Sequence, residues 1–281
     1  MQPENGKECS EKVNYFIEGL QGSGKSTLTT NMVKKHTELT AVREGDYSPV
    51  ELAWCSYVSH DKYNEILDKY SGIRTSIEEK SHIENDHVII CYTQIITNIE
   101  GFHKDLEQYE IYNGQIQFDE FKKIVLNRFE RWNGKDMIFE CSLFQNIVED
   151  MLLFRDVSDD EIIRFYEEIE NVLRDKEYQI LYLETENVSE NIDIIRKERS
   201  DEHGNEMWFP LMLGYFNESP YAKNKGVSGE EALLKHFLHR QELELRICKE
   251  VFTDRYKVLK SKKYEFYLSN QQLHKNVLNG W

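Results

Sequence analysis

Residues 17–27 of this chain read Ile17-Glu18-Gly19-Leu20-Gln21-Gly22-Ser23-Gly24-Lys25-Ser26-Thr27. They match the pattern G-x-x-x-x-G-K-[ST] without a mismatch. Glycines let the backbone curl until successive N–H groups point at phosphate oxygens, the lysine reaches the β- and γ-phosphates, and the next hydroxyl binds Mg²⁺. The motif predicts a site for ATP and Mg²⁺, with Ser26 on the metal. The expected nucleotide-binding residues are Gly19, Gly22, Ser23, Gly24, Lys25, Ser26 and Thr27.

The flanking sequence supplies the context that this motif requires. Val13–Ile17 is typical of a buried strand that runs into the loop, and Thr27–His36 places Leu28, Met32 and Val33 on one helical face. The N-terminus of that helix would add its dipole to the anion site. A chance match in a glycine-rich turn is the alternative, and the strand and helix on either side argue against it.

Composition and charge narrow the class of protein. The 281 residues include 35 Lys and Arg against 51 Asp and Glu, which gives a formal net charge of −16. This balance argues against a nucleic-acid or anionic-membrane partner, although a small anionic ligand remains compatible with it. We find no apolar run of about 18 residues and no secretory leader. The five cysteines are widely spaced, as in reduced proteins, so we expect a cytoplasmic location.

Strand and helix signals alternate along the chain, which predicts an α/β fold with a parallel sheet covered by helices. With the motif, they indicate a three-layer P-loop fold of about five strands in a single domain over residues 11–281. The segment of about 56–132 is expected to be a mostly helical insertion that covers the acceptor site. Within it, residues 86–95 fit either a strand or the start of a buried helix. The expected strands are near Val13–Gly19, Thr40–Arg43, Asp136–Glu140, Gln179–Leu183 and Tyr264–Leu268.

Local patterns also mark individual helices. Ser158 and Ser228 each begin a capping box, and Asn187 opens a helix that runs to about Arg199. The helix after Ser228 runs to about Phe252, and its apolar residues could mediate a homodimer or fill the core. These residues are Leu233, Leu234, Phe237, Leu238 and Leu245. A stripe at helical spacing predicts another core-facing helix, with Phe118, Phe121, Val125, Phe129 and Trp132.

Three groups of polar residues are candidates for chemistry. Glu140 ends an apolar strand, where a carboxylate beside the loop could hold Mg²⁺; it could also be an ordinary strand-terminal acid. Glu44 follows the second strand and could accept the proton of an attacking hydroxyl, or lie in a charged surface loop. Arg196 and Arg199 share a helix face and could stabilise the transferring phosphoryl group, or simply complement the helix C-terminus.

These residues together resemble the P-loop kinases of the thymidylate kinase and deoxynucleoside kinase group. Phe16–Thr27 is similar to the opening of thymidylate kinases. Leu181–Val188, followed by Arg196 and Arg199, resembles that family's fourth strand, the next helix and its arginine-bearing lid. The resemblance covers about half of the chain, mainly the strand-and-loop framework.

Two further segments carry the resemblance and also depart from it. Arg43-Glu44 stands where thymidylate kinases have an Arg-Glu-Pro turn and deoxynucleoside kinases a Glu-Pro turn with the catalytic base, but Gly45 replaces the proline. Phe139–Ser142 resembles the signature after the third strand, but Cys141 stands where both families place a phosphate-binding arginine.

The resulting expectation is an ATP- and Mg²⁺-dependent kinase for a nucleotide, a nucleoside or another small acceptor. The expected catalytic residues are Lys25, Glu44, Glu140, Arg196 and Arg199, with Ser26 and Glu140 at the metal. Two alternatives remain open: a nucleotide-binding ATPase switch that moves a partner, and a catalytically silent P-loop protein, for which Cys141 is the main argument.

Overall fold

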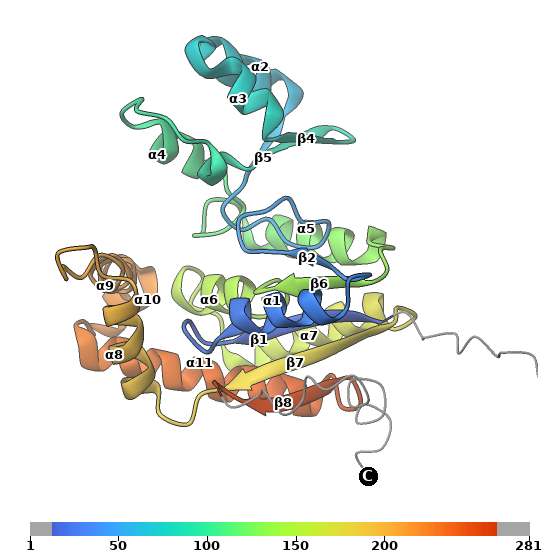
Figure 1. Cartoon of the computed structure of the whole chain (residues 1–281), viewed down its shortest axis with the longest axis vertical. Helices are drawn as coiled ribbons and strands as arrows, with labels where there is room; N and C mark the ends of the chain where they lie inside the picture. Colours follow the sequence, from blue (N-terminus) through green and yellow to red (C-terminus); the bar gives the residue numbers. More distant parts are fainter. Residues whose placement is uncertain (1–12, 263–281) are drawn as a thin grey trace, which may run out of the picture.

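Five parallel strands form the main sheet of the computed structural model, which describes residues 13–262. They lie in the order β2-β6-β1-β7-β8, so β1, the strand before the glycine-rich motif, is central (Figure 1). All neighbouring pairs run parallel, which confirms the expected α/β class. The strands are β1 Asn14–Gly19, β2 Thr40–Val42, β6 Met137–Glu140, β7 Tyr178–Glu184 and β8 Tyr256–Lys260.

The sheet contains one strand that the sequence did not indicate. This strand, β8, pairs with β7 at the edge of the sheet, whereas the expected strand at Tyr264–Leu268 lies outside the described residues. Two of the five residues of β8 are lysines, and only Leu259 is buried, so the apolar signal is weak. Edge strands commonly carry such polar residues. The four other expected strands agree with the structure to within one residue at each end.

Helix α1 (Lys25–Lys35) covers one face of the main sheet. Successive side chains of a strand point to opposite faces, so Tyr15 and Ile17 of β1 both lie on this side. They pack there with Leu28 and Met32 of α1 in a buried cluster. This packing fixes the start of α1 directly beyond the carboxyl end of β1, where the motif needs it.

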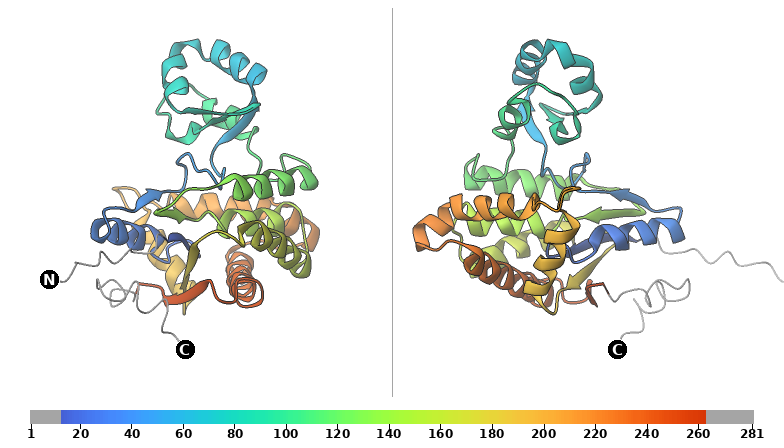
Figure 2. Two further views of the ribbon diagram at one scale, coloured as in Figure 1. Left: turned by 90° about the vertical axis from the view of Figure 1, so that its right-hand side faces the viewer. Right: turned by 60° about the vertical axis from the view of Figure 1, so that its left-hand side comes forward.

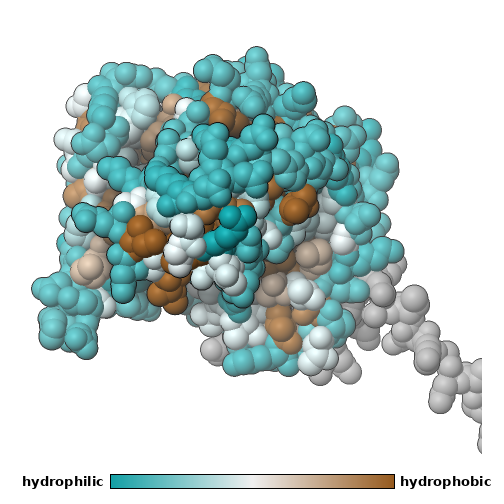
Figure 3. Space-filling view, turned by 90° about the horizontal axis from the view of Figure 1, so that it is seen from above, coloured by the Kyte–Doolittle hydropathy of each residue, from teal (hydrophilic) through white to brown (hydrophobic). Residues whose placement is uncertain are grey.

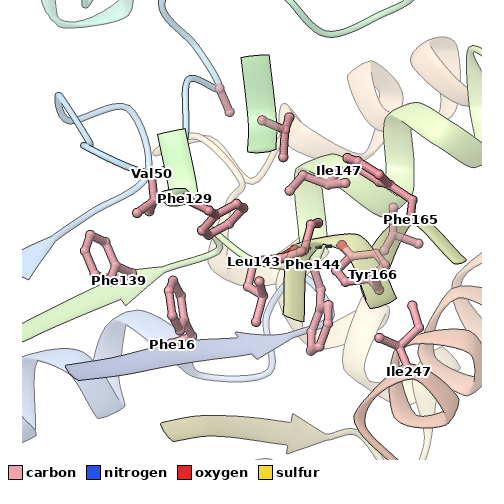
Figure 4. Close-up of a cluster of buried hydrophobic side chains, with 14 of the residues drawn as sticks. Phe16, Val50, Phe129, Phe139, Leu143, Phe144, Ile147, Phe165, Tyr166 and Ile247 are labelled. Carbon is pink, nitrogen blue, oxygen red and sulfur yellow. Dashed lines mark hydrogen bonds between the residues drawn. The ribbon is translucent and has the colours of Figure 1, made fainter. Parts of the chain in front are cut away.

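Four helices cover the opposite face and complete the three expected layers. Phe16 points to this side from β1, and its ring stacks on Phe139 of β6 with ring centroids 5.1 Å apart. Figure 4 shows this core, in which the Tyr166 hydroxyl donates a hydrogen bond to Leu143 O at 2.7 Å. The helices are α5 Phe118–Arg131, α6 Gln145–Leu153, α7 Asp159–Leu173 and α11 Glu230–Glu250.

Residues 56–110 form a lobe that stands apart from the main sheet in every view (Figures 1 and 2). A three-stranded antiparallel sheet in the order β3-β5-β4 lies at its centre. The lobe has an apolar core of its own, which includes Ile66, Val88 and Phe102. Its elements are β3 Ser56–Ser59, α2 His60–Lys69, α3 Arg74–Glu79, β4 Ser81–Glu84, β5 His87–Ile90 and α4 Phe102–Glu107, with short 3₁₀ turns at Ser71–Ile73 and Tyr92–Gln94.

The segment of about 56–132 is therefore shared between the lobe and the main body. Helix α5 carries the predicted aromatic stripe and packs on the main core, not on the lobe. The ambiguous segment 86–95 contains strand β5, in which Ile89 faces the main core while Val88 and Ile90 face the lobe core. Burial on both sides explains why this strand is apolar throughout and shows no alternation.

Two of the three predicted helix caps are present. Ser158 Oγ accepts a hydrogen bond from Glu161 N, and Asn187 Oδ1 accepts one from the third residue beyond it. The capping box at Ser228 is wrong, because Gly229, with φ 85°, is the N-cap of α11 and no side chain caps that end. The remaining helices lie at the carboxyl edge of the sheet (Figure 1): α8 Val188–Glu198, α9 Trp208–Glu218 and α10 Pro220–Lys225.

The surface seen from above is mainly hydrophilic, with separate small apolar groups (Figure 3). On α11, Leu233 and Phe237 are fully buried in the core, whereas Leu238 is 45% exposed. Between residues 13 and 262, the structure has no helix that is both long and apolar enough to span a bilayer. Cys55 and Cys91 are buried neighbours with their sulfurs 3.7 Å apart, and they remain free thiols.

Candidate nucleotide-binding site

The glycine-rich loop connects the end of β1 at Gly19 to the start of α1 at Lys25. Gly19 and Gly22 have φ values of +133° and +72°, which residues with a Cβ rarely adopt. A Cβ at Gly19 would lie 2.6 Å from Leu183 O, and one at Gly22 would lie 2.1 Å from Ile195 Cγ1. Both glycines are therefore required by backbone conformation and by close packing of the loop against β7 and α8.

Two polar side chains of the loop lie inside its curve. Lys25 is 6% exposed, and its ammonium group donates hydrogen bonds to Gly19 O at 2.7 Å and Leu20 O at 2.8 Å. Ser23 Oγ is buried and lacks a hydrogen-bond partner among the described residues. A buried hydroxyl without a partner is costly unless a ligand satisfies it. The loop thus offers a cation and a donor to an anion at the N-terminus of α1.

Ser26 and Glu140 come together at one end of the loop, as the sequence predicted. The Ser26 hydroxyl donates a hydrogen bond to Glu140 Oε1, although 114 residues separate the two. Glu140 Oε2 lies 3.4 Å from Arg43 Nη1, and Arg43 Nη2 donates to Thr30 Oγ1 at 2.9 Å. One carboxylate and one hydroxyl in contact form an oxygen pair of the kind that Mg²⁺ prefers.

Glu44 lies in the turn after β2 and directly follows Arg43, the residue that contacts Glu140. Its Oε1 accepts hydrogen bonds from Trp54 Nε1 at 2.9 Å and from Gln145 Nε2 at 3.0 Å. Asp46 holds the turn in place, because its carboxylate accepts hydrogen bonds from Arg43 N at 3.0 Å and from a side-chain amide of the lobe. The carboxylate is therefore held at the carboxyl edge of the sheet, where the sequence placed it.

Glu18, within the motif run, has a role that the sequence reading missed. It is fully buried behind the loop and accepts a hydrogen bond from Leu143 N at 2.7 Å. Burial is the main cause that raises the pKa of Glu18 to about 7; the nearby Glu244 carboxylate acts in the same direction, whereas backbone donors and Lys25 oppose the shift. An acid inside an otherwise apolar strand was the signal that could have marked it.

A buried ion cluster supports the back of the loop and joins it to α6 and α11. Arg240 is completely buried and binds Glu149 Oε2 at 2.8 Å, Glu244 Oε1 at 3.2 Å and Gln21 Oε1 at 2.7 Å. His236 also lies 3.0 Å from the same Glu149 oxygen. Burial alone would raise the pKa of Glu149, but its contacts with His236 and Arg240 lower it to about 2.

Arg196 and Arg199 do not contact the loop in this structure. Arg196 binds Glu206 Oε1 and Glu230 Oε1, each at 2.8 Å, and its guanidinium lies over the Phe209 ring. The Arg199 guanidinium lies 5.4 Å from the ring centroid of Trp208. Both arginines thus join α8 to the start of α9, while the neighbouring face of α8 contacts the loop through Ile195.

Cys141 follows Glu140 in the position where the resembled families carry an arginine. Its thiol is buried, and burial raises its pKa well above the usual value, so the side chain is uncharged at neutral pH. It cannot replace the charge of an arginine. The charge of Lys25 acts on the Cys141 thiol, and the guanidinium of Arg43 contacts Glu140, the residue before it.

The residues present fit a nucleoside triphosphate with a divalent cation. The two loop glycines hold the loop in its curled, positive-φ conformation against β7 and α8, where a Cβ would collide with Leu183 O or Ile195. Ser23 and Lys25 offer buried donors to phosphate oxygens, and Ser26 and Glu140 offer hard oxygen ligands. In the described residues there is no cluster of three or more His, Cys, Asp or Glu that could bind a metal through protein ligands alone.

Comparison with known proteins gives a partial sequence match and a structural match at a low TM-score. No protein-family model matches the chain. An 85-residue stretch is 33% identical to the Protein SEY1 homolog of Plasmodium berghei (strain Anka); it covers 30% of this chain and 9% of that protein. The chain thus matches only a small part of that relative. The crystal structure of shikimate kinase from Bacteroides thetaiotaomicron aligns over 94% of both chains, at 11% identity and a TM-score of 0.34.

Proposed function

We propose that this protein is an ATP- and Mg²⁺-dependent phosphotransferase that phosphorylates a small acceptor, with a nucleotide or a nucleoside as the acceptor class. The observation that carries the proposal is the convergence of Lys25, Ser26 and Glu140 at the carboxyl edge of a parallel sheet. Ligands bind at this edge in open α/β sheets. The sequence features and the absence of an apolar spanning helix in the described chain are compatible with a cytoplasmic enzyme.

The proposed roles follow from where each side chain lies. Backbone N–H groups of residues 22–26 and the Lys25 ammonium group would hold the phosphates, while Ser26 and Glu140 would hold Mg²⁺. The metal would supply charge neutralisation on the phosphate oxygens. Glu44 would orient the acceptor hydroxyl and accept its proton. Positioning and electrostatics carry this type of transfer, so little covalent chemistry is required of the protein.

The arginines have a less direct part in the proposal. Arg43 contacts Glu140 and would supply the positive charge that Cys141 does not. For Arg196 to stabilise the transferring group, it would have to exchange Glu206 and Glu230 for phosphate oxygens, which requires a shift of α8. We therefore propose no direct contact of Arg196 or Arg199 with the phosphates in the arrangement that the structure shows.

Direct binding tests the nucleotide site before any acceptor is known. We would titrate ATP into the protein by calorimetry, with and without Mg²⁺, for the wild type, Lys25→Ala and Glu140→Gln. The proposal predicts that Lys25→Ala abolishes measurable ATP binding, because the buried cation is lost. Glu140→Gln should remove the Mg²⁺ dependence, because one metal ligand is lost. Equal ATP affinity in all three proteins would contradict the assignment.

An ATPase switch without a small acceptor is the second reading. It shares the nucleotide site, so ATP binding does not separate it from a kinase. Hydrolysis that depends on Lys25 but does not respond to any small acceptor would favour it. A protein that fails to bind ATP with Mg²⁺ would instead be the catalytically silent form.

A further inference from the structure

The turn after β2, residues 43–46, carries Glu44 and has a glycine where a proline would make it rigid. Gly45 has a φ of +85°, and proline cannot adopt this value because its ring holds φ at about −65°. Glycine leaves the backbone more freedom than any other residue, so it does not fix the direction of Glu44. A group that takes part in a reaction has to be held in place. Contacts from outside the turn are therefore needed to orient this carboxylate.

Gln94 of the lobe supplies such contacts. It ends the 3₁₀ turn Tyr92–Gln94, and its Nε2 donates hydrogen bonds to Gly45 O at 2.9 Å and to Asp46 Oδ1 at 2.8 Å. Its Oε1 accepts a hydrogen bond from Lys80 Nζ at 3.1 Å, which fixes the orientation of the amide. The nitrogen of this amide thus holds the turn, while its oxygen is held by the lobe.

Asp46 carries this restraint into the site. Its other carboxylate oxygen, Oδ2, accepts from Arg43 N at 3.0 Å, and its own N–H group donates to Arg43 O at 3.0 Å. The Arg43 guanidinium in turn lies 3.4 Å from Glu140 Oε2. Glu44 lies inside the turn that these bonds close, so its position depends on Asp46 and, through Asp46, on Gln94.

A second contact from the same 3₁₀ turn reaches Glu44 through Trp54. The φ of Trp54 is +64°, a value that a bulky residue adopts only where the surrounding structure holds it. Its carbonyl oxygen accepts from Thr93 Oγ1 at 3.3 Å, and its indole N–H donates to Glu44 Oε1 at 2.9 Å. Because Thr93 and Gln94 are neighbours, one short element of the lobe supports both the backbone and the side chain of Glu44.

We propose that Gln94 is a positioning residue for phosphoryl transfer, which holds Glu44 in the direction needed to receive the acceptor proton. Among the described residues, its hydrogen bonds go to the turn and to Lys80, so its part lies on the acceptor side of the site. The inference rests on the proposed phosphotransferase function. It gives the lobe a part in the reaction, because the lobe holds the proposed base in place.

The variant that tests this role is Gln94→Met, which keeps an unbranched side chain of similar length and removes the amide. Gln108→Met is the matched control. Gln108 also lies in the lobe, and its Nε2 likewise donates to a backbone oxygen and a carboxylate oxygen, Asp105 O at 2.7 Å and Asp105 Oδ1 at 3.0 Å. These two bonds stay within the lobe, so the control removes equivalent bonds without releasing the turn.

The kinetic measurement is ADP formation from ATP and Mg²⁺, with the common deoxynucleosides and their 5′-monophosphates as acceptor probes. With a probe that stimulates the wild type, Gln94→Met should lower kcat at least about tenfold, because a displaced reacting group can cost about a hundredfold in rate. The KM for ATP should stay within about twofold, because the nucleotide loop is untouched. Gln108→Met should match the wild type in both constants. An unchanged kcat in Gln94→Met, a change confined to the KM for ATP, or an equal loss of kcat in both variants would overturn the proposal.

Hydrogen–deuterium exchange tests the positioning without any acceptor. Peptides that contain residues 43–46 should exchange at least about threefold faster in Gln94→Met, because the N–H groups of Arg43 and Asp46 lose the protection of the closed turn. Peptides from β1 should exchange at the wild-type rate in both variants, which shows that the fold is kept. Unchanged exchange at the turn would overturn the proposal whatever the kinetics. If exchange rises as expected but no probe stimulates ADP formation in the wild type, the proposed function fails and the restraint of the turn by Gln94 stands.

Discussion

Arg240→Met tests the buried ion cluster behind the glycine-rich loop. The Arg240 side chain is completely buried and contacts two carboxylates, those of Glu149 and Glu244, and the Gln21 amide of the loop. Methionine matches the arginine stem in length and is uncharged. The substitution therefore leaves the packing largely intact, and among the described contacts it leaves the imidazole of His236 as the one remaining basic group beside Glu149.

The expected magnitude follows from the cost of leaving a charge buried without its partner. Breaking a buried ion pair by removing one member costs about 3–5 kcal/mol. For a domain of this size, that loss corresponds to a decrease in Tm of roughly 6–20 °C. Without the guanidinium, burial should raise the pKa of Glu149 from its low value. The loss should therefore be largest above that raised pKa and should shrink as the pH falls and the carboxyl groups take up protons.

Urea unfolding at several pH values between 5 and 8 measures this effect, and Arg246→Met is its control. Arg246 lies on the same helix but is 44% exposed, and it pairs with Glu250 and Asp160 at the surface. Exposed pairs contribute at most about 1 kcal/mol. If Arg240→Met cost no more than Arg246→Met, or if its cost did not change with pH, the account of the buried ion cluster would be wrong.

Two further predictions concern the loop and the strand before it. Gly22→Ala should destabilise the protein by about 2–4 kcal/mol, because Gly22 has a φ of +72° and the added Cβ would collide with Ile195. In urea unfolding, a double-mutant cycle with Ile195→Ala should show that the second substitution relieves part of this cost. Strictly additive effects of the two substitutions would refute the clash. Glu18→Gln should flatten the pH dependence of stability. Because the pKa of Glu18 is raised to about 7 in the folded protein, the free energy of unfolding of the wild type should fall by up to about 3 kcal/mol as the pH rises from 4.5 to 7. Urea unfolding across this pH range should therefore show that the free energy of unfolding of the variant rises relative to that of the wild type as the pH increases. A difference that stays constant with pH would contradict the raised pKa of Glu18.

The parts of the fold that were predictable depend on short-range patterns. The motif and the apolar strands β1, β6 and β7 are contiguous in sequence, and so are the caps at Ser158 and Asn187. Strand β8 was missed because its stability comes from pairing with β7, and its own residues are largely polar. The lobe sheet was missed because β3 and β4 are short and only half-buried, and β5 is buried on both sides.

In the candidate site, too, only the residues that belong to local sequence patterns could be predicted. Lys25, Ser26 and Glu140 were identified because a local motif and a strand end place them at one sheet edge. The Arg240 contacts join residues up to 219 positions apart, so no local pattern could indicate them. The small cavity lined by Glu110, Asn146 and Tyr215 similarly requires residues of the lobe, α6 and α9 to meet. The positions of Arg196 and Arg199, paired with acids and an aromatic ring at the start of α9, depend on a loop that the sequence reading did not describe.

The most direct test of the central claim is ADP formation from ATP and Mg²⁺, measured with and without a panel of nucleosides and nucleoside monophosphates, for the wild type and Lys25→Ala. We predict strong stimulation by at least one acceptor, a phosphorylated product in equal amount, and loss of both in the variant, under conditions in which its unfolding curve shows that it is folded. Full activity in Lys25→Ala, or hydrolysis that no acceptor stimulates, would contradict the assignment of this protein as a phosphotransferase.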